Sequence, residues 1–154
     1  MKSKTKAILT SWLIAGTLDV STAIIVYSVI LNKIPAKILL QSIASGIFKA
    51  QAFEGGMKMA LIGLIIHYCI AFCFAITYFY LYPRLSFLKK NMIISGILYG
   101  VIVWAIMNLL VLPMVFSHLS PMTFKSAAIA MSILIVMIGL PIAIITDRFY
   151  KRKA

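Results

Sequence analysis

Four long stretches of mostly apolar residues run along the chain, and short polar connections separate them. Each stretch exceeds the roughly 20 residues that a helix needs to cross the hydrocarbon core of a bilayer. Lipid offers no partners to exposed backbone groups, and no segment alternates like a barrel strand, so helices are expected. The pattern predicts an all-α four-transmembrane-helix bundle that forms a single integral membrane domain over residues 1–154. The predicted spans cover about residues 7–31, 58–82, 91–114 and 124–147.

The connection between the first two spans, residues 32–57, is the only predicted connection long enough to have structure of its own. One face of a helix in this segment would carry Leu39, Leu40, Ile43 and Ile47, and another would carry Lys37, Gln41, Ser45 and Lys49. This division predicts an amphipathic helix that lies in the membrane interface over about residues 35–50. A short re-entrant segment is the alternative.

The composition supports a membrane protein. Apolar residues make up 63% of the chain, against roughly 45–50% in ordinary soluble domains. The net charge of +12 does not indicate nucleic-acid binding, because the basic residues lie at the edges of apolar segments and form no groove with interleaved aromatic residues. We expect the lipid bilayer to be the partner of these basic residues, with anionic lipids at the cytoplasmic face.

The distribution of lysine and arginine predicts the orientation. Ten of these residues fall on the side of the two termini and five on the other side. Because cytoplasmic flanks of membrane spans are enriched in lysine and arginine, both termini are predicted to be cytoplasmic. Aromatic residues gather at the same boundary in Tyr78 to Tyr82 and in Phe149 and Tyr150, and are interpreted as interface anchors.

Three polar residues inside the spans are expensive to bury in lipid, namely Asp19, His67 and Asn108. At about 1.5 Å per residue, their depths in the bilayer differ by less than roughly 10 Å. Small residues, which permit close helix approach, share the helical faces of Asp19 and His67. These are Ala15, Gly16, Thr22 and Ala23 in the first span and Ala60, Gly63, Ala71 and Ala75 in the second. The sequence thus predicts an intramembrane polar cluster of Asp19, His67 and Asn108.

Three interpretations of this cluster remain open. In the first, Asp19 is neutral or is hydrogen-bonded to His67, Asn108 or a neighbouring Thr17 or Thr22, and it fixes the register of the helices. In the second, Asp19 and His67 form a titrating pair that carries a proton or binds a translocated substrate. In the third, the polar residues contact a span of a partner protein.

Other polar residues suggest narrower roles. Glu54 stands at the outer entrance of the second span, where a carboxylate favours a helix N-terminus, and is a candidate outer gate. Pro141 removes a backbone donor within the fourth span and is a candidate hinge. Asp147 is interpreted as the partner of the adjacent Arg148 in an interfacial ion pair.

The chain offers little material for catalysis. One histidine, one aspartate and one asparagine are too few ligands for a closed zinc site. The sequence has no recognisable nucleophile motif and no phosphate-binding glycine loop. We therefore expect no metal, no cofactor and no enzymatic activity.

Two segments resemble a family of small four-helix bacterial inner-membrane proteins that has no assigned activity. They are FEGGMKMALIGLIIHYCIAF, from Phe53 to Phe72, and YGVIVWAIMNLLVLP, from Tyr99 to Pro113. The resemblance implies a bacterial plasma membrane and a four-span topology, and it places Glu54, His67 and Asn108 in the family pattern. It implies no reaction.

The expected function is that of a non-enzymatic multi-pass membrane protein, acting alone, as a small homo-oligomer or with a membrane partner. Its buried polar cluster would hold the bundle together or contact that partner. The alternative is a small transporter or proton-conducting subunit that uses Asp19 and His67 as a relay, with Glu54 at its outer mouth.

Overall fold

The computed structural model describes residues 3–115 and 122–151, which are helical and contain no strand. Four helical segments in this part of the chain are long and apolar enough to cross a membrane, so the predicted all-α four-helix membrane fold is confirmed. The first span consists of α1, Lys4–Ile24, and η1, Ile25–Ile30, and the second is α4, Gly56–Leu81. The third comprises α6, Met92–Ala105, η2, Ile106–Val111, and α7, Leu112–Val115, and the fourth comprises α8, Phe124–Leu134, η3, Ile135–Gly139, and α9, Leu140–Lys151.

The spans depart from the predicted ranges mainly at their polar ends. The helix of α1 begins at Lys4, and that of α9 continues to Lys151. Long lysine side chains can keep their ammonium groups in water while their stems lie along apolar surface, so a helix can extend past the apolar run. At the start of α6, the Asn91 side chain accepts hydrogen bonds from the backbone of Ile93 and Ile94. This cap explains why the third span begins at Met92.

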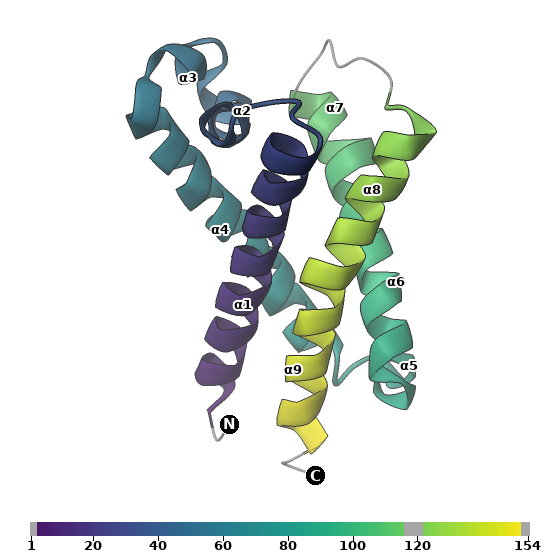
Figure 1. Ribbon diagram of the computed structural model, residues 1–154. Helices are drawn as coiled ribbons and strands as arrows, with labels where there is room; N and C mark the ends of the chain where they lie inside the picture. The colour runs from purple at the N-terminus through teal and green to yellow at the C-terminus, as the bar shows by residue number, and fades with distance from the viewer. Residues whose placement is uncertain (1–2, 116–121, 152–154) are drawn as a thin grey trace.

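Three shorter helices connect the spans: α2, Ala36–Phe48, α3, Gln51–Glu54, and α5, Ser86–Lys90. In Figure 1, α2 is seen end-on and crosses the spans at the end of the bundle opposite the two termini. The predicted helix is therefore present, but its faces were wrongly interpreted. Gln41 and Ser45 of the predicted polar face are buried against α4, whereas Ile47 is 64% exposed.

Glycines set the closest approaches between helices. Gly63 of α4 lies against the backbone of α2, where an added Cβ would overlap the Leu40 carbonyl. Gly139 of η3 lies in the same way against Gly96 and Gly100 of α6. Such small residues allow helices to pack in lipid, where no hydrophobic force drives them together. In the described chain, α1 packs against α4 and the fourth span, and α6 packs against η3 and α9.

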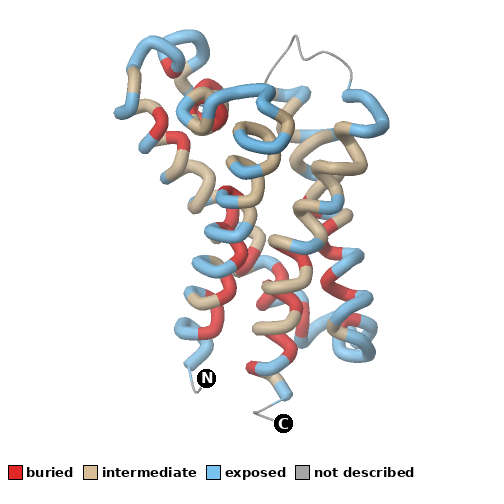
Figure 2. The backbone as a smooth tube through the Cα atoms, viewed as in Figure 1, coloured by how far each residue is buried: buried red, intermediate tan, exposed pale blue. Residues whose placement is uncertain are grey.

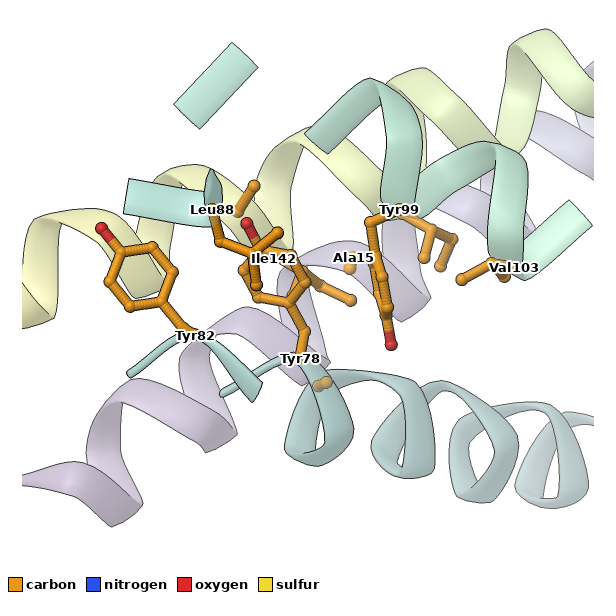
Figure 3. Close-up of a cluster of buried hydrophobic side chains, with 10 residues drawn as sticks. Ala15, Tyr78, Tyr82, Leu88, Tyr99, Val103 and Ile142 are labelled. Atoms are coloured by element: carbon orange, nitrogen blue, oxygen red, sulfur yellow. The ribbon is translucent and has the colours of Figure 1, made fainter. Parts of the chain in front are cut away.

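The tightly packed core lies in the half of the bundle that contains the termini (Figure 2). Tyr78, Phe79, Tyr82 and Phe149 are each at most 2% exposed. In the cluster of Figure 3, the rings of Tyr78 and Tyr99 meet edge to face with centroids 4.7 Å apart. Tyr78, Phe79, Tyr82 and Phe149 are therefore core residues, and their interpretation as interface anchors was wrong. Helices η1, η2 and α7, in the other half, contain no buried residue.

Candidate functional site

Three hydrogen bonds join α1 to α4 at mid-span, and we call their residues, Trp12, Gly16, Thr17, His67 and Tyr68, the α1–α4 seam. The indole Nε1 of Trp12 donates to the carbonyl of Tyr68 at 2.7 Å. His67 Nε2 lies 2.9 Å from the carbonyl oxygen of Gly16. The hydroxyls of Thr17 and Tyr68 are 2.8 Å apart. The seam therefore uses two main-chain carbonyls and one hydroxyl pair to hold the spans side by side.

The geometry of His67 fixes the direction of its hydrogen bond. A carbonyl oxygen only accepts hydrogen bonds, so Nε2 must carry a proton to bond Gly16. The imidazole is therefore the donor in this contact, and the Gly16 main chain is the acceptor.

Asp19 lies one helical turn beyond Gly16 on α1 and is partly buried. His67 is the charged neighbour of this carboxylate. Within the described residues no hydrogen bond to this carboxylate is observed. The structure thus brings Asp19 and His67 near each other without joining them directly.

Asn108 makes its hydrogen bond within its own span. It lies in η2, and its Nδ2 donates to the Trp104 carbonyl four residues earlier, at 3.0 Å. This bond stays within the third span and does not reach α1 or α4. Hydrogen bonds therefore do not connect the three residues of the predicted cluster in the described part of the chain.

Sequence reasoning missed Trp12 and Tyr68, and it considered Thr17 only as a partner of Asp19. The sequence did contain one signal of such hydrogen bonds. Trp12 and Tyr68 lie inside predicted spans, and the polar atoms of buried tryptophan and tyrosine usually find partners. The partners themselves could not be predicted, because Tyr68 lies 51 positions from Thr17 and 56 positions from Trp12 in the sequence.

The entrance to α4 is organised by a residue that the sequence placed on a polar surface. Gln41 is fully buried, and its Nε2 donates to the carbonyls of Phe53 and Gly56 at 3.4 and 3.0 Å. These bonds hold the turn in which Glu54 is exposed. Glu54 therefore stands on the surface at the α2 end of the bundle, and the candidate gate role remains a prediction.

Pro141 lies in the first turn of α9, directly after the π-helical segment η3. Proline supplies no backbone donor, so the preceding turn loses an α-helical hydrogen bond. Wider π-type turns occur where the regular ladder is interrupted. The distortion expected near Pro141 is thus a π-helical segment, and whether it acts as a hinge remains a prediction.

A second polar group lies at the end of the bundle that contains the termini. Asp147 is 2% exposed, and its carboxylate accepts a hydrogen bond from the Tyr82 hydroxyl at 2.6 Å and pairs with Lys151 at 3.0 Å. The partner is Lys151 rather than the predicted Arg148, because residues four apart share a helical face and adjacent residues do not. Burial raises the pKa of the Tyr82 phenol, and the bond to Asp147 raises this pKa further.

No group of three or more histidine, cysteine, aspartate or glutamate side chains is placed to hold a metal ion within residues 3–115 and 122–151. Comparison with known proteins finds no matching family model, no matching curated protein and no matching solved structure.

Proposed function

We propose that the chain is a non-enzymatic multi-pass protein of the bacterial plasma membrane, with both termini in the cytoplasm, and that His67 serves its assembly. The observation that carries this proposal is the contact of His67 Nε2 with the Gly16 carbonyl, 2.9 Å across the seam. A bond to a main-chain carbonyl fixes one helix against another whatever the sequence of the partner side chains. Interhelical bonds of this kind are a common means of assembly in lipid.

The neighbouring contacts support the same role. The Trp12 and Thr17 bonds lie within one and a half turns of Gly16 on α1, and both end on Tyr68. An alanine-sized group at Gly16 would already stand 3.1 Å from the Tyr68 ring. The seam therefore has one register, and a shift along α1 would break all three bonds together.

The assembly role is tested by replacing His67 in the full chain. His67→Leu removes the donor to Gly16 and should lower the unfolding free energy in mixed micelles by about 0.6–1.7 kcal/mol. His67→Gln keeps an amide donor and should lose less. Cys69→Leu, on the exposed side of α4, is the matched control and should change little. Equal stability of the parent and His67→Leu would refute the assembly role.

A second function, proton conduction, is favoured by one specific observation. Asp19 and His67 lie near each other within the membrane spans, and no hydrogen bond joins them in the described part of the chain. Buried aspartate and histidine pairs form proton relays in membrane transporters. In this function Glu54 would lie at the outer mouth of the path.

Proton conduction is tested by reconstitution into vesicles that contain a pH-sensitive dye. The relay predicts that a pH gradient decays faster with the protein than without it. Asp19→Asn keeps hydrogen-bonding capacity but cannot carry a proton, and should return the decay to the rate of protein-free vesicles. Absence of any acceleration by the unmodified protein, or full acceleration by Asp19→Asn, would exclude the relay.

A further inference from the structure

An apolar pocket of about 810 Å³ separates α2 and α3 from the outer part of the third span. Its walls include Ile43 of α2, Ile66 and Ile70 of α4, and Met107, Val111 and Leu112 of the third span. This volume is within the range of about 300–1,000 Å³ that is usual for small-molecule sites. The pocket lies in the half of the bundle that contains α2, outside the α1–α4 seam.

The two serine hydroxyl groups in the pocket wall are hydrogen-bonded to the backbone of α2. Ser42 donates to the Leu39 carbonyl at 2.7 Å, and Ser45 donates to the Ser42 carbonyl at the same distance. Both hydroxyls are therefore satisfied by the backbone of α2. The surface that this wall presents to a bound molecule is therefore mainly alkyl.

A single cationic side chain bridges one rim of the pocket. Lys49 follows the last residue of α2, and its Nζ donates to the Val115 carbonyl of α7 at 3.1 Å. An ammonium group has three donors, and the one bond to Val115 leaves two available. Among the described residues, the pocket lining contains no carboxylate that would compete for them.

The wall formed by the third span has an unusual backbone. Met107 and Val111 both lie in the π-helical segment η2, four residues apart. Helices α4 and η2, which face each other across the pocket, are not among the element pairs that pack closely in the described chain. Single π-type turns occur frequently at functional sites, where they redirect side chains.

We propose that this pocket binds one acyl chain of an anionic glycerophospholipid, taken from the leaflet that contains α2, with the lipid phosphate at Lys49. Acyl chains are as apolar as the pocket wall, so the alkyl contacts hold the chain in the pocket but do not distinguish one lipid headgroup from another. Discrimination between lipids comes from the charge-assisted contact of the ammonium with phosphate. A net negative headgroup is favoured over a zwitterionic one, because the latter brings its own cation to Lys49.

The proposal is tested by native mass spectrometry of the full chain titrated with phosphatidylglycerol and with phosphatidylcholine of the same acyl chains. The unmodified protein should retain one phosphatidylglycerol in preference to phosphatidylcholine by about fivefold, as one lysine near an anionic headgroup implies. Lys49→Gln should abolish this preference. Lys58→Gln removes an exposed lysine outside the pocket and should leave the preference intact.

A second pair of variants tests the acyl-chain site. Ile70→Trp fills the pocket from α4 and should reduce phosphatidylglycerol retention at least tenfold, whereas Leu61→Trp adds the same ring on an exposed face of α4 and should not. If Ile70→Trp is unstable in a thermal melt, Val111→Trp fills the pocket from the opposite wall. Full retention by a folded pocket-filling variant, loss of the preference in Lys58→Gln, or equal retention of the two lipids by the unmodified protein would overturn the proposal.

Discussion

Asp147 illustrates how a charged residue is accommodated within the packed half of the bundle. Its carboxylate is almost fully buried and receives one hydroxyl donor and one ammonium group. Removing one partner from a buried charge leaves part of its desolvation uncompensated. The sequence pointed to a pair with Arg148, because Tyr82 lies 65 residues away and its approach depends on the packing of α4 against α9.

Tyr82→Phe should destabilise the protein in a way that depends on pH. The hydroxyl donates to a carboxylate, so its loss should lower the unfolding free energy at pH 8 by about 1.5–3 kcal/mol. The folded-state pKa of Tyr82 is raised above its usual value near 10, so its stabilising contribution is complete below pH 10 and declines as the pH rises further. Thermal melts between pH 8 and 11.5 should therefore show a smaller difference between parent and variant at the alkaline end.

The control for this pH dependence is Tyr80→Phe, which changes a tyrosine that is 48% exposed. Its melting temperature should stay close to that of the parent at every pH of the series. A parent-to-variant difference for Tyr82→Phe that stays constant or grows above pH 10 would contradict the assigned contact.

At the scale of elements, the four spans were predictable because bilayer thickness requires a long apolar run for each crossing. The existence of α2 was predictable from its periodicity, but the direction of its faces was not. Gln41 is buried because two carbonyls of the following turn require a donor, and this requirement appears only when residues 53–56 fold back on α2. The segments η1 and η2 have no apolar periodicity of their own, so no sequence pattern indicated them, whereas Pro141 marked a distortion near η3.

The close crossing of α2 over α4 gives a prediction at Gly63. In Gly63→Ala the added methyl group would meet the backbone of Leu40, which cannot rotate away like a side chain. Overpacking of this kind should lower the unfolding free energy by about 1–3 kcal/mol, measured in mixed micelles. Gly46→Ala is the matched control, because its methyl group would meet only a Val115 side-chain carbon, at 3.2 Å. Equal losses in the two variants would contradict this account of the crossing.

The whole molecule combines a packed half and an open half. Aromatic side chains fill the half with the termini, whereas the half with α2 contains the apolar pocket. The proximity of Asp19 to His67 could be predicted from depth and helical face, since both follow from residue spacing. The separate bonding of Asn108 could not, because it depends on the geometry of η2 and on a carbonyl of its own span. The pocket depends on the spacing between α4 and η2, which no local pattern encodes.

The orientation of the whole bundle gives the last prediction. Ten lysines and arginines fall on the side of the termini and five on the side of α2, so the side of the termini should be cytoplasmic. In a background with Cys69→Ala and Cys73→Ala, a membrane-impermeant maleimide should label Asn32→Cys in intact cells. Ser86→Cys, exposed beside α5 at the opposite end, should react only after permeabilisation. The reverse labelling pattern would invert the topology, and with it the leaflet from which the pocket takes its lipid.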